Sequence, residues 1–316
     1  EIALQGDLNA RKLQFLYPEH IHSAEGTMHL RAAVSGSPRM PSVDAFLQMG
    51  TARLDFGPNR IPLRLSNLNL QAVSGRIRVS FQLFGKEEAP PLSVAGGIRL
   101  LPDGPRFDGM TIEGIAPNEI LMQLGTRFIS DIQGRLRMKA TANGPFKSPS
   151  LSGSLTGRRL EFRVRGIAEN ISIQEADIRF DDSSFQLNRM KIRYADADFT
   201  LAGRIQRKPR PNFDLSIAGN AVPYNIPDIF QSEFNADLRF SGPLENTELS
   251  GKIDIISGRY IQTYDVIQRI LTVHRFRERE DPPWRFFPAL GKTRLSISLL
   301  NTGELEVSNN VATLQL

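Results

Sequence analysis

Residues 134–155, GRLRMKATANGPFKSPSLSGSL, decide the fold of this chain. Apolar and basic residues alternate from Leu136 to Ala140, and a second alternating run follows Pro149. Between the two runs, Gly144 and the proline after it form a turn signal. Alternation at a period of two residues is typical of a strand with one apolar face. The stretch therefore predicts an antiparallel hairpin with one apolar and one polar face.

The same unit occurs three times along the chain. Turns at Gly36 and Gly242 also follow short alternating runs, and a second run follows each of them. The last two copies match best, because Gly153 and Gly251 take the same place in them, whereas Ala45 stands at that place in the first copy. Self-similarity at a coarse period indicates an array of similar units and not one compact enzyme core.

This recurrence predicts three β-rich segments. The first spans residues 1–132 and includes a short helix near 117–130, the second spans 133–233, and the third spans 234–316. The chain begins at Glu1 without an initiator methionine and stops in the middle of an alternating run. We therefore interpret it as an internal fragment of a longer protein.

Residues 176–205 show the alternation most clearly. Two Asp-containing segments, 181–184 and 195–198, divide this stretch into alternating runs. Asp and Ser favour turns because their side chains hydrogen-bond the nearby backbone, so consecutive hairpins are expected. The apolar phase slips by one residue near Arg189. Since such a shift inverts the two faces of a strand, we expect a bulge or a strand break there.

Helical signals are few. Residues 117–130 open with Pro-Asn-Glu and carry apolar residues at a spacing near 3.6, which predicts an amphipathic helix. Residues 262–271 and a short segment at 227–233 are the other two candidates. Residues 85–91 and 274–283 are charged and contain prolines, so both are expected to be surface loops.

The composition excludes several functional classes. The 39 basic and 34 acidic residues give a net charge of +5, but they are interleaved and form no dense basic stripe, so nucleic acid is not an expected partner. Cysteine does not occur, which rules out disulfides, thiolate catalysis and Cys-based zinc sites. The chain has no run of 18 apolar residues, so we expect no transmembrane helix within it.

Candidate sites for chemistry are weak. His20 and His22 would share one strand face, with His29 nearby, but no third metal ligand is placed by spacing. Gly291-Lys292-Thr293 resembles the end of a phosphate-binding loop, but the position where that motif requires an earlier glycine is Phe286. The sequence contains neither a Gly-x-Ser-x-Gly elbow nor a His-Glu-x-x-His motif. We therefore expect no enzymatic activity, no cofactor and no metal.

These motifs resemble a known family. The stretch at 134–155 is similar to the recurring unit of the TamB family, within the wider AsmA-like group: an alternating strand, Gly-x-x-x-x-Pro-x-Leu-x-Gly, and a second alternating strand. Residues 249–255 and 257–260 are similar to that second strand and to the family's Gly-x-Tyr ending, and residues 305–312 to its late strands. The likeness spans most of residues 25–316.

The resemblance implies a fold and a place in the cell. It implies a mainly β chain, an elongated antiparallel sheet curved into a half-open tube with an apolar groove and a few short helices, in the Gram-negative periplasm. Family members look like bridges that carry phospholipid between inner and outer membranes, with an inner-membrane anchor outside this fragment and an Omp85-type outer-membrane barrel as partner. The alternative is a binding or chaperone module that assists insertion of outer-membrane β-barrel proteins.

An apolar groove suits lipid for a physical reason. A sheet with one apolar face must cover it, and acyl chains can take the place of a second sheet at a gain of about 0.8 kcal/mol per buried CH₂. An enzyme on a β-helix would instead require carboxylates clustered on one face, and we find none in the sequence. The residues expected to line the groove are Leu136, Met138, Leu155, Phe162, Ile178, Phe180, Phe185, Leu187, Ile192, Phe199, Leu201, Leu238, Phe240, Ile253 and Ile255.

Overall fold

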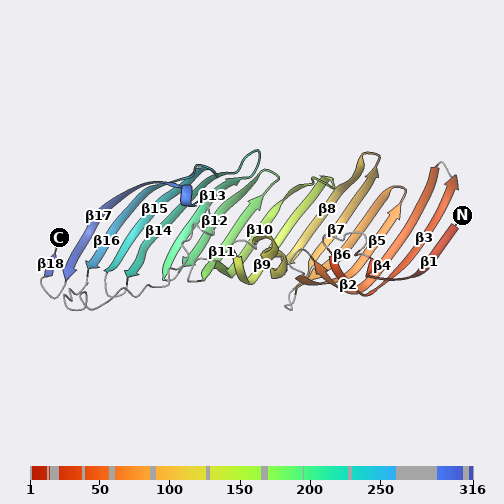
Figure 1. Ribbon diagram of the computed structural model, residues 1–316, viewed down its shortest axis with the longest axis horizontal. Coiled ribbons are helices and arrows are strands. Elements are labelled where there is room, and N and C mark those ends of the chain that lie inside the picture. Colours follow the sequence, from red (N-terminus) through yellow and green to blue (C-terminus); the bar gives the residue numbers. More distant parts are fainter. Residues whose placement is uncertain are drawn as a thin grey trace, which may run out of the picture. The chain divides into compact units, whose positions relative to one another are not determined.

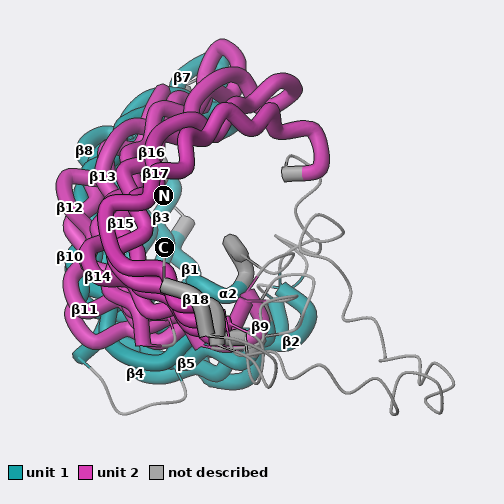
Figure 2. Tube along the Cα trace, turned by 90° about the vertical axis from the view of Figure 1, so that its left-hand side faces the viewer, with its two compact units in different colours: residues 1–126, 132–157, 179–182 teal, residues 127–131, 158–178, 183–316 magenta. Residues whose placement is uncertain are grey.

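A computed structural model of the chain consists almost entirely of β-strands (Figure 1). It describes residues 2–12, 14, 21–37, 40–56, 61–85, 90–125, 129–164, 170–194, 196–226, 230–260, 290–308 and 313–315. The chain forms two compact units (Figure 2). Unit 1 comprises residues 1–126, 132–157 and 179–182, and unit 2 comprises residues 127–131, 158–178 and 183–316. The division into three segments by sequence recurrence stays a prediction.

Unit 1 is an antiparallel sheet in which most neighbours in sequence are neighbours in space. Its strands are β1 (Ile2–Asn9), β2 (Ile21–Glu25), β3 (Thr27–Ser37), β4 (Met40–Phe56), β5 (Ile61–Val73), β6 (Arg76–Phe84), β7 (Leu92–Leu101), β8 (Gly104–Ala116), most of β9 (Ile129–Pro145) and the first half of β10 (Ser150–Val164). β1 pairs with β3, and β3 to β9 follow one another in order, while β2 pairs with the far end of β4. Helix α2 (Asn118–Gly125) joins β8 to β9.

Unit 2 combines antiparallel strand pairs with a parallel pair. Its strands are the rest of β10, most of β11 (Ile171–Phe180), β12 (Ser184–Tyr194), β13 (Ala197–Gln206), β14 (Asn212–Ile226), β15 (Phe230–Pro243), β16 (Glu248–Tyr260), β17 (Arg294–Ser308) and β18 (Thr313–Gln315), with a 3-10 turn at Leu290–Lys292. β12 to β16 pair antiparallel in order, but β16 and β17 run parallel. Residues 261–293 join this pair, and a parallel pair requires a connection of that kind, a dozen residues or longer. The pair is an exception to the antiparallel sheet that was predicted.

In each unit the strands curve round a hollow that stays open along one side (Figure 2). The described strands include no second sheet packed on the first. The prediction of a mainly β fold, curved into a half-open tube with few helices, is therefore confirmed.

The glycines of the recurring unit allow neighbouring strands to approach closely. A Cβ at Gly153 would overlap the carbonyl oxygen of Lys139, and a Cβ at Gly251 would overlap that of Asp237. Gly251 also has a φ of +137°, which residues with a side chain rarely adopt. Glycine inside a strand often marks such close approach of another backbone, so these positions explain why the unit repeats glycine there.

The predicted hairpins and the predicted bulge are confirmed. Each of the three glycine turns connects two paired strands, namely β3 to β4, β9 to β10, and β15 to β16. In the pairing of β12 with β13, the register shifts between Leu187 and Met190, where the apolar phase slips near Arg189. The bulge restores apolar residues to one face of β12 on both sides of the shift.

Of two predicted helices, one is confirmed and the other is wrong over its described residues. α2 confirms the helix near 117–130, although it is shorter, because residues 129–130 already belong to β9. The helix predicted at 227–233 is wrong from Phe230 onward, where β15 begins. Phe230 is paired with a strand on each side, and that pairing outweighs a weak local helical pattern.

Several sequence predictions concern residues outside the described ranges. They are the helix at 262–271, most of the loop at 85–91, the loop at 274–283, and His20.

Candidate functional site

The apolar face of unit 2 is built from side chains that lie opposite one another on successive strands. Met190, Leu201, Ile217 and Leu238 form one such row across β12 to β15. Residues opposite each other in a ladder point to the same side of the sheet, and so does every second residue along each strand. We call this side the inner face of unit 2. Its larger side chains are Phe185, Leu187, Met190, Ile192, Phe199, Leu201, Ile205, Phe213, Leu215, Ile217, Leu238, Phe240, Leu249, Ile253, Ile255, Leu295, Ile297 and Leu299.

The inner face of unit 2 is only partly covered. Leu187 and Met190 are each 7% exposed, but most of its side chains are half-buried, and Leu295 and Leu299 on β17 are each 68% exposed. A core between two packed sheets would exclude water from such residues and fill the space around them. The inner face therefore has the form of an apolar trough that can accept a further apolar layer.

Unit 1 has a corresponding apolar face, which is packed more tightly. Met28 on β3 and Met49 on β4 lie opposite each other and are 2% and 0% exposed. Val94, Met110 and Ala142 form a second buried cluster on β7, β8 and β9. We call this side the inner face of unit 1.

Most of the predicted groove residues lie on these inner faces. Leu136 and Met138 belong to the inner face of unit 1, because β9 pairs in register with the apolar side of β8. The register of β12 to β17 brings together, on the inner face of unit 2, Phe185, Leu187, Ile192, Phe199, Leu201, Leu238, Phe240, Ile253 and Ile255. On β10 and β11, the buried or half-buried ones are Leu155, Phe162, Ile178 and Phe180. That any of them binds lipid stays a prediction.

Part of the two inner faces was not predicted from the sequence. No groove residue before Leu136 was predicted, although Met28 and Met49 are among the most buried side chains of unit 1. The inner-face side chains of β14 were also missed, although residues 213–217 alternate apolar and polar side chains. The same period-two signal, applied to every strand, would have found them.

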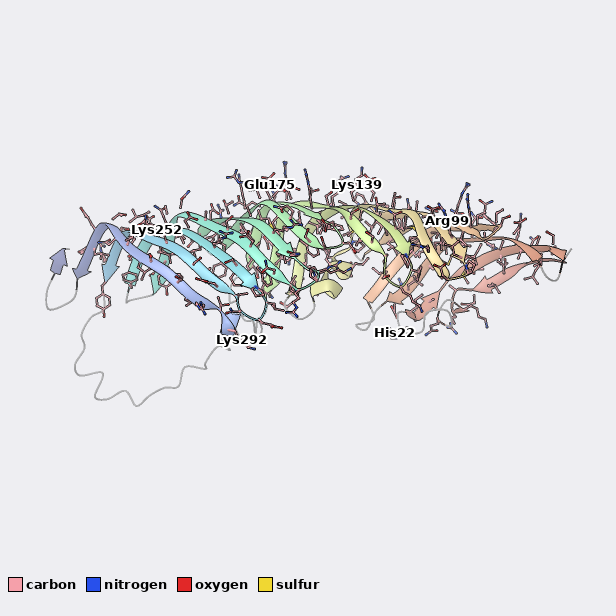
Figure 3. All side chains as sticks on the ribbon, turned by 90° about the horizontal axis from the view of Figure 1, so that it is seen from above. His22, Arg99, Lys139, Glu175, Lys252 and Lys292 are labelled. Atoms are coloured by element: carbon pink, nitrogen blue, oxygen red, sulfur yellow. The ribbon has the colours of Figure 1, made fainter. Side chains whose placement is uncertain are left out.

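The opposite, outer faces carry charged pairs across strands. In unit 2, Arg193 Nε lies 2.7 Å from Asp198 Oδ1, and Arg239 Nε lies 2.8 Å from Asp214 Oδ1. The hydrogen bond from Arg193 holds the pKa of Asp198 below its usual value, so this pair stays charged at neutral pH. Lys139 of unit 1 and Glu175 of unit 2 each point away from the hollow of their own unit (Figure 3). Exposed pairs add little stability, but they keep the outer face in water.

Helix α2 lies on the hollow side of unit 1 (Figure 2). It follows β8, yet it contacts β5, which lies three strands away in the sheet. Ile120 and Leu121 are half-buried, and both backbone amides donate hydrogen bonds to the carbonyl oxygen of Pro117, at 3.0 and 3.2 Å. Gly85, which directly follows β6, lies beside Glu119. A Cβ at Gly85 would overlap the side chain of Glu119. The helix therefore crosses the ends of the strands between β8 and β5.

The histidines do not form a metal site within the described ranges. His29 Nδ1 pairs with a carboxylate oxygen of Asp7, and His22 Nε2 is buried with no hydrogen-bond partner. No group of three or more His, Asp or Glu among the described residues is placed to hold a metal ion. In the same part of the chain, no helix is both long enough and apolar enough to cross a membrane.

Comparison with known proteins identifies a related family. Residues 188–265 match the family model described as the TamB C-terminal domain. They include β13 to β16, which form the centre of the inner face of unit 2. No curated protein and no solved structure matches the chain. The match confirms the resemblance to the TamB family over residues 188–265, and it supports a role of that family's kind in the Gram-negative cell envelope.

Proposed function

We propose that the inner faces hold phospholipid acyl chains and that the chain is a segment of a periplasmic bridge carrying phospholipid between inner and outer membranes. The observation that supports this proposal is the partly covered inner face of unit 2, with Leu295 and Leu299 each 68% exposed. Apolar surface left in water costs about 25 cal/mol per Å², and acyl chains laid along the trough remove that cost. The phospholipid head groups stay in water on the open side.

This role needs no catalytic group. The trough is passive, so direction and energy come from the proteins at its two ends. On the family pattern these are an inner-membrane anchor elsewhere in the full-length protein and an Omp85-type barrel in the outer membrane. The conduit itself has only to remain apolar along its length and to keep its outer face hydrated.

Lipid capture from the inner face is the direct test. A photo-reactive residue in place of Phe199, on the inner face of unit 2, should crosslink to phospholipid when the protein is isolated from cells. The same residue in place of Thr200, the next position along β13 and on the outer face, is the matched control and should capture none. Mass spectrometry of the crosslinked product and of an organic extract identifies the lipid. Crosslinks from position 199 to protein side chains only would contradict the proposal.

A second candidate function is the binding of unfolded outer-membrane strands. Of the described residues of β17, only 306–308 pair with β18, so residues 294–303 present an edge with no described strand beside it. An exposed edge can add an extended peptide as a new strand. Tight binding of barrel-derived peptides by a protein that contains no phospholipid would favour this function over the conduit.

Removal of α2 is expected to expose more of the inner face of unit 1. Replacing residues 118–125 with a Gly/Ser linker should raise the fluorescence of an apolar dye bound to the protein, because the helix lies across strand ends on the hollow side. The far-UV circular dichroism spectrum checks that the sheet is retained. Unchanged dye binding by a folded variant would mean that α2 only caps the sheet end and does not plug the trough.

A further inference from the structure

The outer face of unit 1 places opposite charges across neighbouring strands at several positions. Glu113 on β8 faces Lys139 on β9, with 3.9 Å between Oε1 and Nζ, and Glu25 on β2 faces Arg53 on β4. Such pairs are favourable, whereas like charges directly opposite each other destabilise a sheet. Arg53 also faces Arg64 on β5, and a longer row of like charges lies across three other strands.

Three arginines lie side by side across β6, β7 and β8. Arg76 faces Arg99, and Arg99 faces Arg106. We call these three residues the arginine row. Arg78, two residues along β6 from Arg76, points to the same side of the sheet. Because each neighbour in the row repels the next, the arrangement is costly unless an anion lies between the side chains.

The protein supplies only part of the negative charge that this cluster requires. Arg99 donates two hydrogen bonds to Asp108, at 2.7 and 2.8 Å, and Arg106 lies 4.0 Å from Asp103. The hydrogen bond from Arg99 holds the pKa of Asp108 below its usual value, and the charge of Arg76 acts in the same direction. No carboxylate of the described residues forms an ion pair with Arg76 or with Arg78. The four arginines therefore outnumber the two carboxylates that pair with them.

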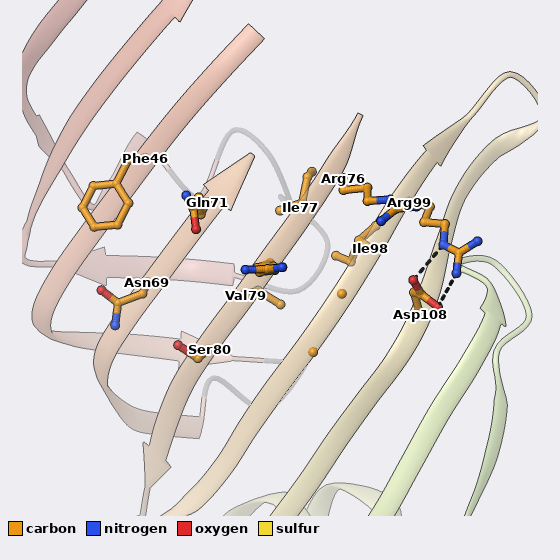
Figure 4. A pocket seen from close by; sticks show the side chains of 13 residues that line it. Phe46, Asn69, Gln71, Arg76, Ile77, Val79, Ser80, Ile98, Arg99 and Asp108 are labelled. Carbon is orange, nitrogen blue, oxygen red and sulfur yellow. Dashed lines mark hydrogen bonds and ion pairs between the residues drawn. The ribbon is translucent and has the colours of Figure 1, made fainter. Parts of the chain in front are cut away.

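Three of these arginines, Arg76, Arg78 and Arg99, line a hollow. It has a volume of about 630 Å³, and Gly96 and Gly97 leave its floor without side chains. Arg76 and Arg99 lie together at one end, with Asp108 hydrogen-bonded to Arg99 (Figure 4). Neutral hydrogen-bonding groups line the other side of the hollow, from Asn69, Gln71 and Ser80. A second hollow of about 610 Å³ adjoins it, lined by Gln71, Val73, Ser74, Arg76 and Arg78.

We propose that the arginine row and Arg78 form a binding site for a phosphate group. A guanidinium fork matches two phosphate oxygens, and a phosphate has enough oxygens for several arginines to share it. A bound phosphate would replace the repulsion along the row with charge-assisted hydrogen bonds, and Gln71 and Asn69 would complete its shell. The phosphate can belong to an anionic lipid head group or to a free phosphate compound. The site lies on the outer face, so it does not depend on lipid transport along the inner face.

The double variant Arg76→Gln, Arg78→Gln tests the site without breaking a described ion pair. Arg53→Gln, Arg64→Gln is the matched control, since it removes two exposed arginines that face each other on β4 and β5 of the same unit. Binding of inorganic phosphate to the intact chain is measured by titration calorimetry, with chloride at equal ionic strength as the blank. We expect saturable binding that is about tenfold weaker in the double variant and unchanged in the control.

Binding to vesicles distinguishes a phosphate in a lipid head group from a free phosphate compound. The wild-type chain is mixed with vesicles of phosphatidylglycerol and with vesicles of phosphatidylcholine, and the bound fraction is measured by sedimentation. If the double variant loses binding to phosphatidylglycerol vesicles and the control variant does not, the site takes lipid head groups. If the double variant and the control variant bind the vesicles equally, the site takes a free phosphate. Without phosphate, the double variant should melt no lower than wild type, because it has lost a repulsion. The proposal is overturned if wild type binds no phosphate, or if the control loses as much binding as the double variant.

Discussion

The variant Leu201→Asp is expected to fold and to carry no phospholipid. Leu201 lies on the inner face of unit 2, half-buried between Met190 on β12 and Ile217 on β14. In an empty trough the new carboxylate reaches water, so folding loses only some apolar contact. In a filled trough the same carboxylate would lie in hydrocarbon, and an unpaired charge there is strongly unfavourable. Native mass spectrometry should find phospholipid on the wild type and only background on the variant, while the two melt at similar temperatures.

Two controls make this result decisive. Thr200→Asp places the same charge one residue away, on the outer face opposite Lys191, and should retain both lipid and stability. Leu160→Asp places it at a side chain that is 1% exposed and should unfold the protein, because burying an unpaired carboxylate costs several kcal/mol. If Leu201→Asp unfolds the protein as Leu160→Asp does, the inner face is a closed core and the conduit is wrong.

The variant Gly251→Ala is expected to lower the free energy of unfolding by at least about 1–3 kcal/mol, the usual cost of a residue held in a backbone region open mainly to glycine. Gly251 has a φ of +137°, and a Cβ there would overlap the carbonyl oxygen of Asp237 on β15. The overlap is with backbone, so no side chain can turn away to relieve it. Urea denaturation should show a lower midpoint with an unchanged slope.

Gly50→Ala is the matched control for that substitution. Gly50 lies in β4, and a Cβ there would meet nothing within 4 Å. Alanine also restricts the unfolded chain more than glycine does, so this variant should be as stable as wild type or slightly more stable. Equal stability of the two variants would mean that β15 and β16 are not held as closely as the structure has them.

Much of the local structure follows from short stretches of sequence. The alternation at 136–140 and the glycine turn after it predicted a hairpin, because a period of two residues places every second side chain on the same face. The slip near Arg189 predicted a bulge for the same reason, and the register shift between Leu187 and Met190 confirms it. The inner-face side chains could be predicted wherever alternation was followed, since a strand carries its own division into two faces.

The sequence by itself determined the strands, their turns, the bulge near Arg189 and the two-faced character of the sheet, because each depends on residues a few positions apart. Only the tertiary structure decided the parallel pairing of β16 with β17, the strand at 230–233 where a helix was predicted, and the contact of α2 with β5. It also decided the arginine row, since Arg76, Arg99 and Arg106 come from three strands that no sequence motif connects. The physical reason is that register and strand order are set by the summed pairing of long segments, and a shift of one residue would have placed each arginine on the opposite face.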